Sequence, residues 1–121
     1  MSPGRPRRDP QAKTSRRPGY PARELDELIA EITVDAYGED EALTGFEVAF
    51  DDLASFPVAG TVVGEEVEVL SVAVAHGRRE LVASCSRGGR RYDVALLDVE
   101  CSGDSDFERI LAAYRRWLGC E

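Results

Sequence analysis

The sequence predicts an α+β fold with an N-terminal helical hairpin, a small antiparallel sheet and a C-terminal helix. Two apolar stripes at helical spacing come first, and an alternating stretch broken by glycines follows. A third helical stripe closes the chain. The 121 residues, 43% of them hydrophobic, suit one domain, which we place at residues 23–121 behind a disordered basic arm at 1–22.

The first two stripes predict helices at about 22–36 and 39–54. The first consists of apolar residues at i, i+3, i+4 and i+7, namely Leu25, Leu28, Ile29 and Ile32. The second contains Leu43, Phe46, Phe50 and Leu53. Gly38 suits the N-cap of the second helix, and Glu41 stands at its capping-box position. Because the break between the helices is short, we expect an antiparallel hairpin.

Four or five short strands are expected within residues 58–99. The alternation over 65–74 places four side chains on one face, namely Val67, Val69, Ser71 and Ala73. Glycines near 64, 77 and 88–89 suit hairpin turns. So many short strands in about 40 residues indicate either a small bent sheet or an SH3-like barrel. Ser105 and Glu108 form a capping box that opens the last helix, at about 105–118.

Charge is distributed in three blocks, although the chain as a whole carries −8. Residues 1–23 sum to +6 and hold five of the six prolines, a composition that favours disorder. Residues 24–68 carry fourteen acids and no lysine or arginine. Residues 69–121 are neutral overall. The basic arm can reach nucleic acid, an anionic surface or its own acidic neighbour.

The residue inventory argues against an enzyme. The chain has a single histidine, His76, and no phosphate-binding loop or zinc-protease motif. Its three cysteines, Cys85, Cys101 and Cys120, are widely spaced and lack a CxxC pair, so we expect inert thiols in a reducing cytoplasm. No apolar run is long enough for a membrane span, and no signal peptide opens the chain.

The acidic block has the composition of a cation-binding surface. At the predicted turn between the helices the carboxylates are Asp35, Glu39, Asp40 and Glu41. At the other pole of an antiparallel hairpin, Asp51 and Asp52 would meet acids of the first helix. Clustered oxygen donors without cationic partners favour Ca²⁺ over Mg²⁺. The spacing is not that of an EF-hand, and a merely solvated acidic face remains the alternative.

A family resemblance favours the calcium interpretation. The stretch Ile32-Thr33-Val34-Asp35-Ala36-Tyr37-Gly38-Glu39-Asp40-Glu41 resembles the small calcium-binding proteins first described from cyanobacteria. Phe56-Pro57, the segment from Gly64 to Leu70 and the closing Tyr114-Arg115-Arg116-Trp117-Leu118-Gly119 follow in the family's order. The likeness covers about 23–119. The second helix is less aromatic than the family's, and the arginine-rich arm is not a feature of it.

The resemblance implies a non-enzymatic cytoplasmic protein that binds or buffers Ca²⁺ through surface carboxylates. Four expected ligands match the family motif directly, namely Asp35, Glu39, Asp40 and Glu41. Asp51 and Asp52 match its acidic second-helix end more loosely. Because such positions are exposed, we expect weak to moderate affinity.

The alternative is an interaction module. In it the acidic hairpin binds a basic protein, or the arm and the Arg87–Arg91 segment bind nucleic acid. Because the acidic block repels phosphate and the two acidic helices carry almost no basic residues, nucleic acid is not the partner that we expect.

Overall fold

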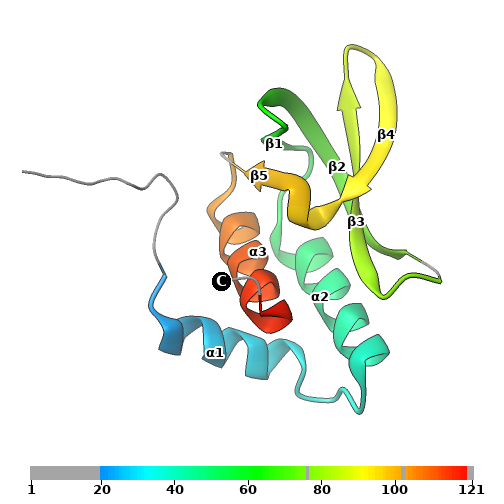
Figure 1. Cartoon of the computed structure of the whole chain (residues 1–121). Coiled ribbons are helices and arrows are strands. Elements are labelled where there is room, and N and C mark those ends of the chain that lie inside the picture. The colour runs from blue at the N-terminus through cyan, green and yellow to red at the C-terminus, as the bar shows by residue number, and fades with distance from the viewer. Residues whose placement is uncertain (1–19, 76, 102, 120–121) are drawn as a thin grey trace, which may run out of the picture.

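The part of the chain that the structure describes has three helices and five strands in the order α1–α2–β1–β2–β3–β4–η2–β5–α3 (Figure 1). The computed structural model describes residues 20–75, 77–101 and 103–119. The elements are α1 (Ala22–Ile32), α2 (Glu39–Leu53), β1 (Val58–Val62), β2 (Glu65–Ala75), β3 (Glu80–Arg87), β4 (Arg90–Ala95), the 3₁₀ turn η2 (Leu96–Asp98), β5 (Val99–Cys101) and α3 (Ser105–Leu118). Most of the predicted arm lies outside the described residues, as do His76 and Cys120. Within the described ranges, no helix is long and apolar enough to cross a membrane.

The five strands form one open antiparallel sheet in the order β4-β3-β2-β1-β5. The α+β class is confirmed, and of the two predicted sheet forms the open sheet is the correct one. The SH3-like barrel is wrong because β4 and β5, the two edge strands, do not pair with each other. Helices α2 and α3 cover one face of the sheet instead, and the core lies between these layers (Figure 1).

A β-bulge in β2 changes which side chains point into the core. Up to Val69 the alternation follows the prediction, with Val67 and Val69 buried. The register with β3 then shifts between Val69 and Ser71. Because side chains alternate with a period of two, the extra residue reverses the faces, so that Val72 is buried while Ser71 and Ala73 are exposed. The predicted face that included Ser71 and Ala73 is therefore wrong.

Aromatic side chains join α2 to α3 in the core. Phe46 and Tyr114 are fully buried with ring centroids 5.5 Å apart, and Phe50 lies 5.0 Å from Phe107. The Tyr114 hydroxyl accepts a hydrogen bond from the Leu81 backbone N–H at 3.0 Å. Burying each of these rings contributes about 2–3 kcal/mol. The two helices and the sheet are thereby held as one rigid platform.

Helix α1 ends at Ile32, four residues before the predicted boundary. Both the backbone N–H and the hydroxyl of Thr33 donate to the Ile29 carbonyl, at 2.9 and 2.8 Å, and Ala36 N–H donates to the Thr33 carbonyl. A β-branched residue that bonds back to the helix in this way favours termination. The chain then turns through residues 33–38 into α2.

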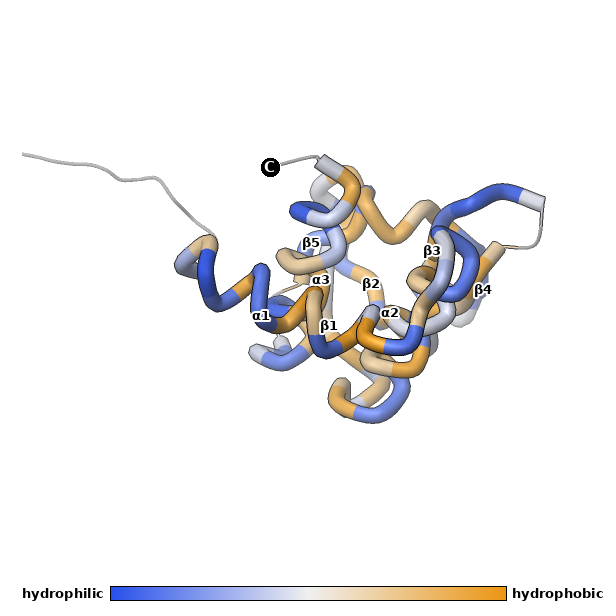
Figure 2. The backbone as a smooth tube through the Cα atoms, turned by 90° about the horizontal axis from the view of Figure 1, so that it is seen from below, coloured by the Kyte–Doolittle hydropathy of each residue, from blue (hydrophilic) through white to orange (hydrophobic). Residues whose placement is uncertain are grey.

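Figure 1 shows α1 lying across the end of the α2–α3 layer instead of alongside α2. Leu25 and Leu28 are buried, and Figure 2 shows hydrophilic segments along much of the rest of this helix. The Arg116 guanidinium of α3 donates to the Asp26 carboxylate at 2.7 Å, and this hydrogen bond holds the pKa of Asp26 below its usual value. Helix α1 is therefore anchored to α3 as well as to α2.

The cap of α3 is Asp104, and the predicted Ser105–Glu108 capping box is wrong. One Asp104 oxygen accepts the N–H groups of Asp106 and Phe107 at 2.9 and 3.1 Å, and the other accepts Ser55 N–H at 2.7 Å. Partial burial opposes ionisation of this carboxyl. The three donated hydrogen bonds outweigh that opposition, so the pKa of Asp104 is lowered. Asp104 caps the helix in preference to Ser105 because one of its carboxylate oxygens accepts N–H groups of α3 while the other accepts an N–H group just after α2.

We expect Asp104→Ala to lower the free energy of unfolding at pH 7 by about 2 kcal/mol, because it removes the cap and the tie to Ser55. Urea denaturation measures the change. The pKa of the Asp104 carboxyl is lower in the folded state than in the unfolded state. Its contribution to the free energy of unfolding is therefore fully present above pH 4 and disappears as the pH falls through the folded-state pKa. The difference in the free energy of unfolding between wild type and variant should become smaller at pH 3, and an unchanged difference would contradict the role of Asp104 as the cap.

Candidate functional site

A surface groove lies where the α1–α2 turn meets α2, and its volume is about 500 Å³. We call it the acidic groove. Its lining comprises Glu31, Ile32, Val34, Asp35, Ala36, Glu41, Thr44, Gly45, Val48 and Ala49. Three carboxylates and an apolar floor therefore share one concavity. Two of the three, Asp35 and Glu41, are candidate ligands from the sequence.

Gly45 allows the groove to form. A β-carbon at this position would stand 2.5 Å from the backbone carbonyl oxygen of Ile32. The last carbonyl of α1 therefore approaches the backbone of α2 more closely than any side chain would permit. This contact, together with the early end of α1, places the turn bearing Asp35 beside α2.

The three groove carboxylates differ in what they bind. Glu41 Oε1 accepts a hydrogen bond from the Tyr37 N–H at 3.0 Å, which ties the turn to the first turn of α2. Among the residues that the structure describes, no hydrogen bond or ion pair reaches the carboxylates of Glu31 and Asp35. Glu31 is not among the candidates from the sequence. Its position four residues before Asp35, on the same face of the helix predicted for residues 22–36, is the signal that could have identified it.

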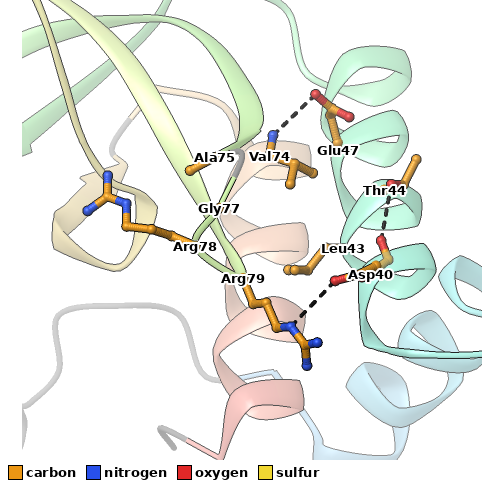
Figure 3. Close-up of a pocket in the computed structure, with 9 residues that line it drawn as sticks. All are labelled: Asp40, Leu43, Thr44, Glu47, Val74, Ala75, Gly77, Arg78 and Arg79. Atoms are coloured by element: carbon orange, nitrogen blue, oxygen red, sulfur yellow. Dashed lines mark hydrogen bonds and ion pairs between the residues drawn. The ribbon is translucent and has the colours of Figure 1, made fainter.

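Glu39 and Asp40 have a cationic partner that the local sequence does not reveal. Arg79, in the β2–β3 turn, approaches Glu39 Oε1 at 3.3 Å and Asp40 Oδ1 at 3.7 Å. Figure 3 shows Arg79 reaching toward Asp40 across the gap between β3 and α2. The expectation that these carboxylates lack cationic partners is therefore wrong for Glu39 and Asp40. All three side chains are largely exposed, so the pairs are weak.

A second pocket, of about 500 Å³, lies between α2 and the β2–β3 turn (Figure 3). Asp40 and Arg79 line it together with Glu47, whose carboxylate accepts the Val74 N–H at 3.3 Å. Each acid of this pocket already has a partner. It therefore offers fewer open donors to a cation than the acidic groove does.

Asp51 and Asp52 lie in the last turn of α2 and are not part of the lining of the acidic groove. Both side chains are exposed. Figure 1 shows this end of α2 near the sheet, whereas α1 crosses at the opposite end. The predicted meeting of Asp51 and Asp52 with acids of the first helix is therefore not formed, because α1 does not run alongside α2.

The acidic groove contains oxygen donors, but in this structure they do not form a complete coordination shell for a metal ion. Within the described ranges, no three Asp, Glu, Cys or His side chains converge closely enough to hold an ion. Burial raises the thiol pKa of both Cys85 and Cys101, so neither offers a thiolate at neutral pH. The donor chemistry of the acidic groove fits a hard cation, and its exposed carboxylates have to reorient to close on one.

The β3–β4 hairpin has the predicted Gly-Gly turn, with φ of 58° at Gly88 and 81° at Gly89. Arg87 pairs with Glu65 at 3.0 Å, and Arg90 and Arg91 are exposed. The tight turn continues a regular ladder in which Arg87 faces Arg90. This geometry is that of an ordered hairpin.

Trp117 of α3 lines a third surface pocket, which lies beside the turn between α1 and α2. The pocket, of about 420 Å³, also includes Gly38, Glu39 and Ala42. The indole lies 5.3 Å from the Phe46 ring, measured between centroids. Trp117 thus connects the aromatic core to the acidic beginning of α2.

Comparison with known proteins identifies two similar solved structures. The crystal structure of Anabaena CcbP has a TM-score of 0.68 and 25% sequence identity, and the alignment covers 89% of this chain and 95% of that one. A second structure, described as a calcium binding protein in the calcium-binding form, has a TM-score of 0.65 and 24% identity, with 79% and 90% covered. No family model and no curated protein sequence matches the chain.

Proposed function

We infer from the shared fold that this chain belongs to the CcbP-like family, and we propose that it binds Ca²⁺ at the acidic groove. Asp35, Glu41 and Glu31 are the proposed carboxylate ligands. The observation that carries the proposal is their presence in one concavity, where Glu31 and Asp35 have no partner among the described residues. Glu39 and Asp40 lie next to the groove and add negative potential. Asp51 and Asp52 are proposed as a separate, weaker point of binding.

The chemistry of the groove suits Ca²⁺ better than its common competitors. All the available donors are oxygens, a donor set that is typical of Ca²⁺, Mg²⁺ and Mn²⁺ sites, whereas zinc and copper sites usually contain histidine or cysteine. Ca²⁺ accepts six to eight oxygens in loose geometry, so water and backbone carbonyls can complete a shell begun by side chains. Mg²⁺ requires a tighter octahedron and releases its water reluctantly. A groove with exposed, unconverged carboxylates therefore favours the larger ion.

Exposure of the ligands sets the expected affinity. The carboxylates have to be ordered when the ion binds, and that ordering opposes binding. We therefore expect a dissociation constant on the order of 10⁻⁵ to 10⁻³ M, typical of sites weaker than a cytosolic buffer of the EF-hand type. Such a site responds to large changes in Ca²⁺ concentration and suits buffering. The protein acts in this proposal by binding the ion and not by catalysis.

Calorimetric titration of the metal-stripped full chain at 0.15 M salt tests the proposal. We expect saturable Ca²⁺ binding and at least tenfold weaker Mg²⁺ binding. Absence of heat, together with an unchanged melting temperature at millimolar Ca²⁺, would refute it. The acidic surface would then be assigned to a basic protein partner, which is the alternative that the sequence leaves open.

Replacing Arg79 with Gln is expected to strengthen Ca²⁺ binding about two- to fourfold. The change removes the positive charge that pairs with Glu39 and Asp40, and surface pairs of this kind contribute about 0.2–1 kcal/mol. Calorimetry measures the change in affinity. Arg78→Gln is the matched control, because Arg78 carries the same charge one residue away and pairs with Glu80 at 3.4 Å. Equal effects of the two substitutions would show that only net charge matters.

A further inference from the structure

The acidic groove also has the features of a docking site for a long basic side chain. Its floor includes Val34, which is 74% exposed, and Val48, which is 50% exposed. The carboxylates of Glu31, Asp35 and Glu41 line the same concavity. An arginine or lysine can lay its aliphatic stem on such a floor and place its charged head among the carboxylates. The groove therefore fits a cationic side chain as well as a metal ion.

An acidic stripe connects this groove to the point where the described chain begins. Glu24, Glu27, Glu31 and Asp35 follow one face of α1 and its turn, and all four are exposed. The stripe starts beside Tyr20, whose ring packs against the core and fixes the start of the described chain. Helix α1 has 11 residues, so the stripe rises about 16 Å from its beginning to the groove.

Residues 1–19 supply a segment of matching charge and length. They contain six basic residues and one acid, and the bases are Arg5, Arg7, Arg8, Lys13, Arg16 and Arg17. In general, a flexible chain of nineteen residues has a root-mean-square span of about 24 Å. That span exceeds the length of the stripe, so the arm can reach the groove from its attachment at Tyr20. The stripe carries four carboxylates, and one basic residue lies at its start, the exposed Arg23, one turn before Glu27 on α1.

We propose that residues 1–19 dock along the acidic stripe and place a basic side chain in the acidic groove of the same molecule. Docking then competes with Ca²⁺ for Glu31, Asp35 and Glu41, a consequence that rests on the proposed function. The apparent affinity for Ca²⁺ then equals the intrinsic affinity multiplied by the fraction of molecules in which the groove is open. An arm that is docked in about 70–90% of molecules weakens Ca²⁺ binding about three- to tenfold.

Docking is tested first without metal, in the full chain. In one variant Arg5, Arg7, Arg8, Lys13, Arg16 and Arg17 are all replaced by Gln. We expect its amide NMR signals to differ from wild type at Val34, Asp35, Gly45 and Val48, and we expect the difference to vanish in 0.5 M NaCl. The control replaces Arg90 and Arg91 with Gln and should leave the groove signals unchanged. Unchanged groove signals in the arm variant would overturn the proposal. A difference that grows with protein concentration would also overturn it, because the arm of a second copy would then be the occupant.

Calorimetry with Ca²⁺ then tests the competition. The arm variant should bind Ca²⁺ about three- to tenfold more tightly than wild type at low salt, and the Arg90/Arg91 control should not. Tighter binding without any change in the groove signals would assign the effect to long-range charge and overturn docking. If no variant binds Ca²⁺ but the groove signals still depend on the arm, docking stands and the proposed calcium function fails.

Discussion

Replacing Asp35 with Asn and Glu41 with Gln in one chain is expected to weaken Ca²⁺ binding at least tenfold. The substitutions keep the shape of both side chains and remove two of the three carboxylates of the acidic groove. One charge contact at 4 Å contributes about 1 kcal/mol in bulk water and about 4 kcal/mol at a partly shielded protein surface. A tenfold change needs about 1.4 kcal/mol, so the loss of two contacts suffices. Calorimetric titration at 0.15 M salt gives the affinity directly.

The matched control removes the same charge elsewhere. Asp98→Asn combined with Glu100→Gln neutralises two exposed acids at the η2–β5 junction, outside the acidic groove. We expect this variant to keep its Ca²⁺ affinity within about a factor of two, because the charges of η2 and β5 are screened by salt. If the two double variants lose equal affinity, the protein attracts Ca²⁺ through its overall charge and the groove is not the site.

Replacing Gly45 with Val is expected to lower the free energy of unfolding by about 2–3 kcal/mol. Any β-carbon at this position would stand 2.5 Å from the Ile32 carbonyl oxygen, so α1 has to move away from α2 to admit it. Overpacking of a close contact costs about 1–3 kcal/mol, and a branched side chain belongs at the upper end. Urea denaturation followed by circular dichroism measures the loss.

Thr44→Val serves as the control for this substitution. Thr44 is the preceding residue of α2, it is exposed, and valine is nearly isosteric with it. The change removes only the exposed hydrogen bond from the Thr44 hydroxyl to the Asp40 carbonyl, so we expect a loss below about 1 kcal/mol. If Gly45→Val were as mild as Thr44→Val, the close contact between α1 and α2 would not exist in solution.

The fold was largely predictable because apolar side chains recur at the period of each element. Leu43, Phe46 and Phe50 are spaced for one face of a helix, and all three are buried. The β-bulge after Val69 was missed although the sequence carries a sign of it, because the large apolar residues occupy odd positions up to Val69 and even positions from Leu70 onward. The cap of α3 was misplaced by one residue for a different reason. Asp104 and Ser105 are both good caps, and the choice depends on the distant Ser55 N–H.

The candidate site was predictable only in part, because charges meet across long stretches of sequence. Asp35 and Glu41 lie in one groove, which the short turn between their helices already suggested. Arg79 could not be paired with Glu39 from local spacing, since the two residues are forty positions apart. The direction of α1 was equally hidden, because it depends on the contact between Gly45 and Ile32 and on the ion pair between Asp26 and Arg116.

The pocket beside Trp117 gives the protein a built-in optical probe. This residue is the chain's single tryptophan, and its indole shares a pocket with Gly38 and Glu39 at the beginning of α2. Emission from an indole depends on the polarity and charge around it, so an ion that reorders the turn should change its intensity or wavelength. Excitation at the indole band can therefore follow binding without any dye. Rapid mixing would then time the arrival and departure of the ion, and this time resolution separates a fast buffer from a slow sensor.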